Sequence, residues 1–572
     1  MDRRNFLKFS AAGAVAPYFP SFAPLAQAAP VARLVDAHAH VFNANDLPIV
    51  GFVEKVVVTG HAEFQNLVAK YGSSIDFFVR FLADWIRGKA PLATYEIAEI
   101  DRIAADPSLK RSAGKIRTDE IANLTQLIKD LMDQSLLKGR KKAGGKLFEY
   151  YVPLYVVALM HEEAYPALYE TENAYDRDTW QTPANLAKQL YDVGNGDFGR
   201  YLRWALQLTR YRFELLDVLT TIHGGKMKLA LPAIIDFSKW VGDSFDVKIV
   251  DQMRVMGKIA AMKGGPRTHF YMTFDPMREA LHRLKAEGPL SPLDAVKEAV
   301  LKQGAIGIKM YPPMGFYPLG NTGKPNSAYP KALAKIFVGA KKPVGAALDE
   351  ALNDFYAFCK DKNVPIIAHA AESNGAVPGY EKRADPALWA PVLKAYPGLH
   401  LNLAHFGHFD RYFKAKNPKA AKLTDTWEWN LAQLAKDHPE CKVFGDLGYT
   451  TFALLKDPNN QKPKETARML GEIRTAFPFM GQRILFGSDW FMLGQEKLFA
   501  ASSTGGQLAA QMDEILIKAG FTDTERDGIM FKNAGAFLGI DKKDAKGGNR
   551  ERLTDFYKTH SLDAGWMKDF EA

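Results

Sequence analysis

Eight short apolar runs of strand length are spaced along the chain, and each ends in polar, glycine or proline residues. Most lack the alternation of a half-exposed strand, which is typical of parallel strands buried on both faces. Amphipathic helical stretches lie between the later runs. Eight strands alternating with helices predict an α/β fold, a (β/α)8 barrel of the TIM type. The runs are Leu34–His40, Tyr155–His161, Thr268–Phe274, Ala305–Tyr311, Val364–Ala370, His400–Gly407, Lys442–Leu447 and Arg483–Trp490.

Two connections in this pattern are too long for simple strand–helix units. The segments after the first and second runs read as mainly helical, near residues 62–146 and 162–267, and we expect long helical insertions there. Both are interpreted as insertions over the barrel mouth, so residues 29–540 form one barrel domain. Residues 541–572 are expected to form a helical C-terminal tail.

Composition excludes several other classes of protein. Of the 572 residues, 47% are hydrophobic and 24% are charged, which is near the globular average and unlike a disordered or collagen-like chain. Seventy-four Lys and Arg against 65 Asp and Glu leave a net charge of +9, and the basic clusters are brief, so we expect no nucleic-acid partner. Only Cys359 and Cys441 are present, so neither a thiolate metal site nor a disulfide is expected.

The first 28 residues have the pattern of an export signal. Arg3 and Arg4 precede a short, mildly apolar run, and small residues follow at Ala26–Ala28. This order resembles a twin-arginine signal peptide, which implies delivery to the periplasm by the twin-arginine export machinery and removal of residues 1–28. Three prolines between residues 17 and 24 argue against a stable membrane anchor.

Histidines and one aspartate gather at the ends of the predicted strands. His38 and His40 are two apart in the first run and therefore project to the same side. His369 ends the fifth run, His405 lies in the sixth, and Asp489 ends the eighth. Barrels place catalytic groups at the carboxyl ends of their strands, and four histidines with one carboxylate suit a borderline metal such as Zn²⁺.

The ordered set of motifs DAHAH, IIAHA, LAHFGH, ILFGSDW and IMFKNAGAFLGI resembles the amidohydrolase superfamily. Within it, the resemblance is to the amidohydrolase-2 branch, which also contains metal-dependent decarboxylases. The resemblance implies that His38, His40, His369 and Asp489 are metal ligands and that His405 is an acid/base beside the metal. The chain departs from the family pattern in its two insertions and at Trp490-Phe491.

Four further residues are candidates for substrate or second-metal contacts. Lys309 lies in the fourth run, where binuclear relatives carry a carboxylated lysine that bridges two metals. We expect one divalent metal, Zn²⁺, with Lys309 neutralising charge; two metals bridged by carboxylated Lys309 are the alternative. Glu372 and Arg383 follow the fifth strand, and His161 ends the second.

Three functions are compatible with these residues. The first is hydrolysis of an amide, ester or lactone by metal-activated water, with Asp489 as the base and His405 positioning the nucleophile or stabilising an oxyanion. The second is non-oxidative decarboxylation at the same site, with His405 or Asp489 supplying the proton. The third, an exported barrel that only binds a ligand, is disfavoured because a full ligand set without metal leaves buried polar groups poorly matched. A small-molecule substrate is expected in the first two cases.

Overall fold

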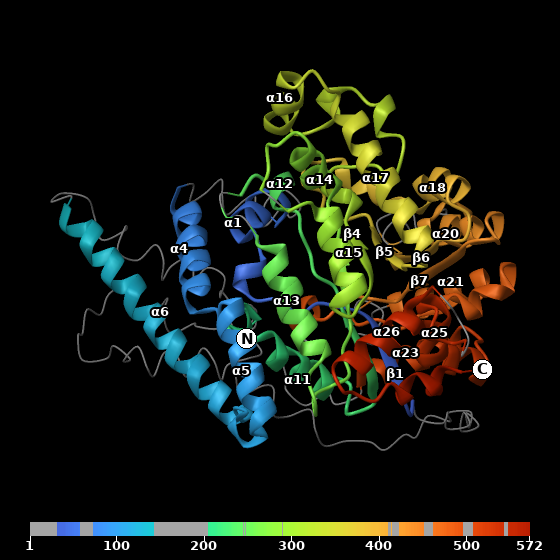
Figure 1. Ribbon diagram of the computed structural model, residues 1–572, viewed down its shortest axis with the longest axis horizontal. Coiled ribbons are helices and arrows are strands. Elements are labelled where there is room, and N and C mark those ends of the chain that lie inside the picture. Colours follow the sequence, from blue (N-terminus) through green and yellow to red (C-terminus); the bar gives the residue numbers. More distant parts are fainter. Residues whose placement is uncertain are drawn as a thin grey trace, which may run out of the picture.

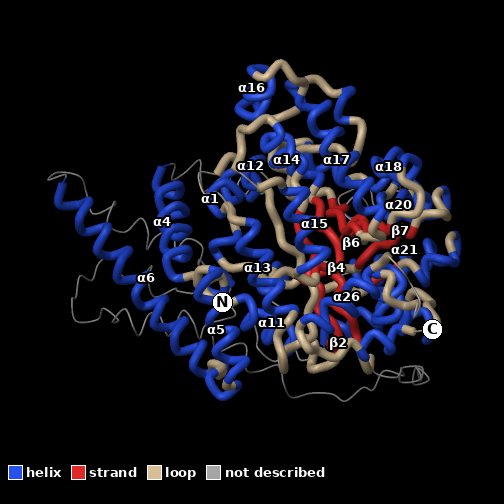
Figure 2. Tube along the Cα trace, in the orientation of Figure 1, coloured by secondary structure: helices blue, strands red, loops and turns tan. Residues whose placement is uncertain are grey.

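In the part of the chain that the computed structural model describes, eight parallel strands follow one another in sequence order, in a two-stranded and a six-stranded sheet. The structure describes residues 31–57, 73–141, 204–243, 245, 247–288, 290–409, 413, 422–450, 461–495, 507–542 and 547–571. Helices and loops surround the strands on the outside (Figure 2). The strands are β1 (Leu34–Ala39), β2 (Met227–Pro232), β3 (Phe270–Thr273), β4 (Ala305–Met310), β5 (Ile366–Ala371), β6 (His400–Gly407), β7 (Lys442–Asp446) and β8 (Ile484–Leu485).

Parallel pairing runs from each strand to the next. β1 pairs with β2, and β3 to β8 form a continuous six-stranded sheet. Isolated parallel bridges join the two sheets, at Ala230–Thr268 and Ala233–Tyr271 on one side and at Ala39–Trp490 on the other. The α/β prediction is confirmed, and the strand order is that of a (β/α)8 barrel.

The prediction for the second strand needs correction. β2 is Met227–Pro232, inside the region predicted to be the second insertion, whereas Tyr155–His161 lies outside the described residues. The long insertion therefore separates β1 from β2, and the connection from β2 to β3 is short. The sequence favoured Tyr155–His161 because that run is the more apolar of the two. In β2 only the last four residues are buried, and the strand character of β2 depends on pairing with β1.

The described part of the insertion is helical, as predicted for residues 62–146. Its helices α4 (Ser73–Lys89) and α6 (Ala113–Lys141) lie to one side of the strands, whereas α5 (Ala93–Ala105) and α11 (Arg212–Ile222) approach the body (Figure 1). A buried ion cluster ties the insertion to the loop after β1. In it, Arg212 bonds Asp46 at 2.5 Å and Glu96 at 2.5 Å.

Helices between the later strands match the amphipathic stretches in the sequence. α17 (Val344–Asp361), α20 (Trp427–Asp437) and α21 (Lys462–Ala476) confirm the three predicted helices. Several start at a side-chain cap, as where the Ser291 hydroxyl accepts from the backbone N–H of Asp294. The other α-helices among the described residues are α1 (Ile49–Phe52), α12 (Ser238–Val241), α13 (Ile249–Ala260), α14 (Pro276–Arg283), α15 (Pro292–Lys302), α16 (Lys331–Gly339), α18 (Ala390–Ala395), α23 (Gln507–Lys518), α24 (Asp523–Asp527), α25 (Asn533–Leu538) and α26 (Asn549–Thr559).

The predicted C-terminal tail is helical and belongs to the core. Every strand contributes at least one residue to a buried apolar cluster that also includes residues of α25 and α26. Leu553, Met567 and Phe570 of the tail are each at most 4% exposed. Residues 547–571 therefore pack beneath the strands as an integral part of the domain.

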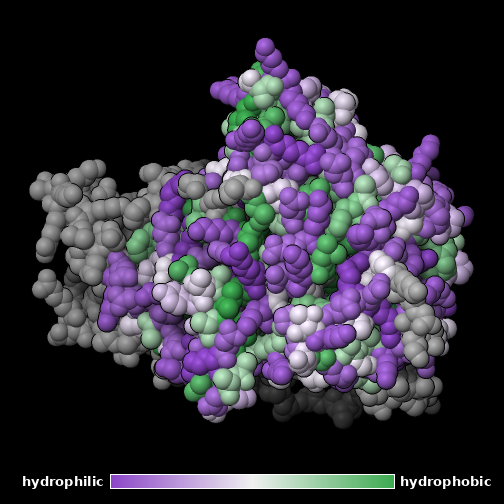
Figure 3. Space-filling view, in the orientation of Figure 1, coloured by the Kyte–Doolittle hydropathy of each residue, from purple (hydrophilic) through white to green (hydrophobic). Residues whose placement is uncertain are grey.

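The face of the molecule in Figure 3 is mainly hydrophilic, with smaller hydrophobic areas between charged ones. Among the described residues, none of the helices combines the length and the apolar character needed to cross a membrane.

Candidate metal centre

The ends of β1 and β8 meet edge to edge, which brings His38, His40 and Asp489 together. The backbone N–H of Asp489 donates to the His38 carbonyl at 2.7 Å, and the N–H of His40 donates to the Trp490 carbonyl. Asp489 follows the two-residue strand β8, whereas His38 and His40 lie in β1 and directly after it. Residues about 450 positions apart in sequence thus form one compact group.

Asp489 Oδ1 lies between the two imidazoles of this group, 3.4 Å from His38 Nε2 and 3.3 Å from His40 Nε2. We call these three residues the Asp489 cluster. All three are buried, at 6% exposure or less. The other nitrogen of each ring donates a hydrogen bond, from His40 Nδ1 to the Ala233 carbonyl at 3.0 Å and from His38 Nδ1 to Asp446 Oδ1 at 3.1 Å.

The hydrogen-bond partners determine where the lone pairs point. A carbonyl or carboxylate oxygen can only accept, so both Nδ1 atoms carry a proton, and the two Nε2 atoms are the ring nitrogens that face Asp489 Oδ1. Three acceptors that face one another are matched by a cation. Zn²⁺ bonds of about 2.0–2.1 Å in tetrahedral geometry place ligand atoms about 3.3–3.4 Å apart. The donor types and spacing of the Asp489 cluster therefore fit a divalent metal.

Burial and charge act in opposite directions on the Asp489 cluster. Burial raises the pKa of Asp489, but the charges and hydrogen bonds of the neighbouring histidines outweigh it, so the pKa falls well below its usual range. Burial lowers the pKa of His40, against the opposing effect of Asp489. An ionised carboxylate and a neutral imidazole are the forms that bind a metal.

Lys309 of β4 contributes a buried positive charge beside this cluster. Its Nζ lies 3.0 Å from His38 Nε2 and its side chain is 1% exposed. Burial lowers the pKa of Lys309 to about 8, while Asp489 and Asp446 act to raise it. The Lys309 ammonium thus faces His38 Nε2, the same atom through which His38 would bind a metal.

His369 and His405 form a second pair of rings next to the cluster. His405 Nδ1 donates to the Gly448 carbonyl at 3.0 Å, so His405 Nε2 accepts from His369 Nδ1, also at 3.0 Å. His369 Nε2 in turn lies 3.1 Å from the Ser373 hydroxyl, and Tyr311 stacks on its ring with centroids 4.5 Å apart. Burial lowers the pKa of His405 to about 3 and also lowers that of His369.

Two groups of three ligand atoms, each with all atoms within 4.8 Å of one another, occur among the described residues. One is the Asp489 cluster and the other is His38, His405 and Asp446; His369 is in neither. Of the four ligands implied by the resemblance, the structure brings three together and places His369 against His405 instead.

Backbone strain is concentrated at the ends of β6, β7 and β8. His405 has φ of +66° and Asp489 has φ of +55°, a region that non-glycine residues rarely adopt. Such conformations persist where surrounding contacts over-determine them, and they are common at functional sites. Other non-glycine residues here with positive φ are Phe406, His408, Phe409 and Tyr449.

Asp446, at the end of β7, was not singled out in the sequence. It is fully buried and its two oxygens accept four hydrogen bonds. Burial raises the pKa of Asp446, but His38 and His405 together lower it well below the usual range. A carboxylate that ends a predicted barrel strand was the available signal, in the motif KVFGDL.

The remaining predicted contacts lie in varied surroundings. Arg383 is buried, donates to the Gly315 carbonyl and to the Ala328 carbonyl at 2.7 Å, and stacks over Tyr380 at 3.6 Å, so it holds loops together. Glu372 is partly buried directly after β5, and His161 lies outside the described residues.

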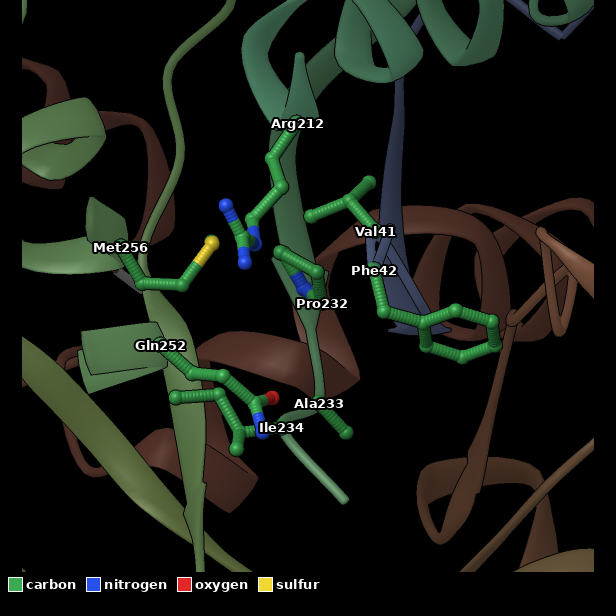
Figure 4. A pocket seen from close by; sticks show the side chains of 8 residues that line it. All are labelled: Val41, Phe42, Arg212, Pro232, Ala233, Ile234, Gln252 and Met256. Carbon is green, nitrogen blue, oxygen red and sulfur yellow. The ribbon is translucent and has the colours of Figure 1, made fainter. Parts of the chain in front are cut away.

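A small pocket lies beside the Asp489 cluster, between the ends of β1 and β2 and helix α13 (Figure 4). One of its lining residues, Ala233, accepts the hydrogen bond from His40. Met256 turns its sulfur toward the Arg212 guanidinium at one end of the pocket (Figure 4). The pocket thus adjoins the residue that holds the His40 ring; its lining residues are Val41, Phe42, Arg212, Pro232, Ala233, Ile234, Gln252 and Met256.

Comparison with known proteins gives one family match, to the Amidohydro_2 model, described as Amidohydrolase. It covers residues 286–540, less than half of the chain, from before β4 to the end of α25. This part includes Lys309, His369, His405 and Asp489 but not β1. The match supports the resemblance to amidohydrolases, whose members are metal-dependent enzymes. No curated protein matches the chain.

Three solved structures are distantly similar. A probable 2-pyrone-4,6-dicarboxylic acid hydrolase from Acinetobacter baumannii is 10% identical, with 57% of this chain and 88% of that chain covered and a TM-score of 0.32. A 2,6-dihydroxybenzoate decarboxylase from Rhizobium is 14% identical, with 62% and 95% covered and a TM-score of 0.32. An uncharacterised TIM-barrel protein from Bordetella bronchiseptica is 13% identical, with 61% and 92% covered and a TM-score of 0.32. These values are too low to support a conclusion about activity.

Proposed function

We propose that this chain is a metal-dependent hydrolase of the amidohydrolase family that acts on an amide, ester or lactone carbonyl. The observation that carries the proposal is the Asp489 cluster, in which one carboxylate oxygen faces two imidazole lone pairs at 3.3 and 3.4 Å. The Nδ1 proton of each ring is already donated, to Asp446 and to Ala233, so the two Nε2 atoms and the carboxylate oxygen that face one another have the donor types of a divalent-metal site. The match of residues 286–540 to the amidohydrolase model supports the same reading.

A divalent metal in this cluster would supply Lewis acidity, lowering the pKa of water from about 15.7 toward about 7 and polarising a carbonyl. Asp489 keeps a second oxygen, Oδ2, which can take a proton from the nucleophile and return it to the leaving group. His405 is neutral, because burial lowers its pKa to about 3, and its Nε2 accepts from His369 Nδ1, so the two rings would act on the nucleophile as a hydrogen-bonded pair. Lys309 offsets the negative charge that develops on the substrate.

One Zn²⁺ is the metal content we propose. Asp446 belongs to the second group of possible ligands, but its Oδ1 already accepts three hydrogen bonds, from His38, His405 and Gly448. That oxygen has no lone pair left for a second metal. A single metal at the Asp489 cluster leaves Lys309 as the uncarboxylated, charge-balancing residue.

The second candidate is non-oxidative decarboxylation, and Lys309 is the observation that favours it. A buried ammonium 3.0 Å from His38 Nε2, next to a cation site, creates a positive region suited to a substrate carboxylate. In this reaction the carbon–carbon bond to the carboxylate breaks, CO₂ leaves, and a proton that His405 or Asp489 takes up from water is transferred to the carbon.

Metal analysis together with product analysis tests these proposals. The purified protein should hold close to one equivalent of Zn²⁺, and chelation should remove metal and turnover together. A panel of lactones, esters, amides and carboxylic acids, assayed for ring-opened acid, alcohol, amine and CO₂, distinguishes hydrolysis from decarboxylation. A preparation that turns over equally well after complete removal of metal would refute both, and two tightly held equivalents would favour the binuclear site.

We also propose export to the periplasm, which rests on the Arg3-Arg4 pair and the small residues at Ala26–Ala28. Folding before export would allow metal insertion in the cytoplasm.

A further inference from the structure

The carboxylate of Asp446 accepts hydrogen bonds from both His38 and His405, and so connects the Asp489 cluster to the neighbouring pair of histidines. Its Oδ1 accepts from His38 Nδ1 at 3.1 Å, from the His405 backbone N–H at 3.1 Å and from the Gly448 N–H at 2.9 Å. Its Oδ2 accepts from Asn402 Nδ2 at 2.7 Å. The residue is fully buried, so each of these partners is fixed by the protein rather than by solvent.

The contact with His38 determines which nitrogen of that ring can bind a cation. Because Asp446 only accepts, the proton resides on His38 Nδ1 and the lone pair on Nε2. Nε2 is the atom 3.4 Å from Asp489 Oδ1. In the opposite tautomer Nε2 would carry a proton toward the metal position, and the ring could not act as a ligand there.

The same three-residue segment also fixes His405. The Gly448 carbonyl accepts from His405 Nδ1 at 3.0 Å, and Asp446 holds the His405 backbone in its left-handed conformation. Gly448 must be a glycine for a spatial reason: a Cβ there would lie 2.8 Å from Asp446 Oδ1 and 2.8 Å from His38 Nδ1. The turn is therefore packed directly against the ring that it orients.

We propose that Asp446 is a positioning residue for the metal: it orients His38 in the Nδ1-protonated tautomer, and its negative charge makes His38 Nε2 a stronger ligand, so that Asp446 sets the affinity of the Asp489 cluster for a divalent cation. This inference rests on the proposed metal site and adds a residue to it that does not itself ligate. Carboxylates that receive the second N–H of a metal-binding histidine commonly change metal affinity by 10–100-fold.

Asp446→Asn is the sharpest test, because it removes the charge but preserves the shape. The new amide oxygen can still accept from His38 and the two backbone N–H groups, so the tautomer and the turn are kept while His38 loses the negative charge that raises the basicity of its Nε2. Its NH₂ would face Asn402, whose own amide can turn over to present Oδ1, an atom that has no hydrogen-bond partner among the described residues. The expected result is a 10–100-fold weaker Kd for Zn²⁺, measured by competition with a chromophoric chelator, and altered visible absorption of the Co²⁺ form.

Two further variants separate positioning from stability. Gly448→Ala pushes Asp446 and His38 apart without changing the carboxylate, and it should weaken Zn²⁺ binding in the same direction if Asp446→Asn fails to fold. Asp513→Asn is the matched control: this buried carboxylate pairs with Arg526 at 2.8 Å and has no contact with the Asp489 cluster. It should lower the free energy of unfolding and leave the Zn²⁺ affinity unchanged.

The outcomes distinguish the two proposals. If the wild-type protein binds neither Zn²⁺ nor Co²⁺ stoichiometrically, the proposed metal site fails and this inference fails with it. If the wild type binds one metal and Asp446→Asn binds it within threefold of the same Kd, the metal site stands and the positioning role is refuted. A weaker Kd in Asp446→Asn, with Asp513→Asn unchanged, supports the role.

Discussion

Replacing Arg212 by methionine tests how firmly the insertion is attached to the segment that carries His40. Arg212 is 2% exposed and is the only cation in the described contacts of Asp46 and Glu96. Its guanidinium bonds Asp46 at 2.5 and 2.7 Å, and it bonds Glu96 at 2.5 Å. Methionine fills a similar volume but leaves two buried carboxylates without their counter-ion.

The expected loss follows from the burial of all three groups. Removing one partner of a buried ion pair costs about 3–5 kcal/mol, because the remaining charge stays desolvated. Here two carboxylates at 2% and 0% exposure are left, so Arg212→Met should lower the free energy of unfolding by at least about 3 kcal/mol. The triple variant Arg212→Met, Asp46→Asn, Glu96→Gln buries no charge and should recover much of this loss.

Urea unfolding of the metal-free protein, followed by tryptophan fluorescence and far-ultraviolet circular dichroism, measures the effect. Lys518→Met is the control, since Lys518 and Glu514 form a surface pair at 57% and 59% exposure that should contribute less than about 0.5 kcal/mol. A loss below about 1 kcal/mol for Arg212→Met would refute the reasoning, as would a triple variant no more stable than the single one.

Three further results are expected. His405→Ala should keep the metal and lower turnover by roughly 10²–10⁴-fold, because it removes a proton-transfer group rather than a member of the Asp489 cluster; His369→Ala should empty the site if His369 is a ligand and should keep the metal if it only supports His405. Burial lowers the pKa of His269 to about 4, so the unfolded chain binds a proton that the folded chain does not. Stability should therefore fall as the pH drops from 6.5 to 4, by up to about 3 kcal/mol from this group; His269→Gln should lose that part of the slope. Changing Arg3 and Arg4 together to Lys should retain the protein in the cytoplasm, and unchanged periplasmic delivery would refute the twin-arginine interpretation.

The sequence by itself determined the elements whose signals are local. Seven of the eight strands and the helices α17, α20 and α21 were predictable, because buried strands and amphipathic helices leave their periods in neighbouring residues. The same is true of His38 and His40, since alternation along one strand places them on one side. Their grouping with Asp489 followed from the rule that the ends of parallel strands meet at one edge.

The tertiary structure decided the features that depend on residues far apart in the chain. β2 is a strand because Met227–Pro232 pairs with β1 across the insertion. This pairing could not be predicted from a six-residue run in which only the last four positions are buried. Asp446 orients His38 from 408 positions away. His369 lies against His405, and Lys309 reaches His38, because of how neighbouring strands are aligned. Periodicity records burial within an element, whereas the register between elements is a property of the packed chain alone.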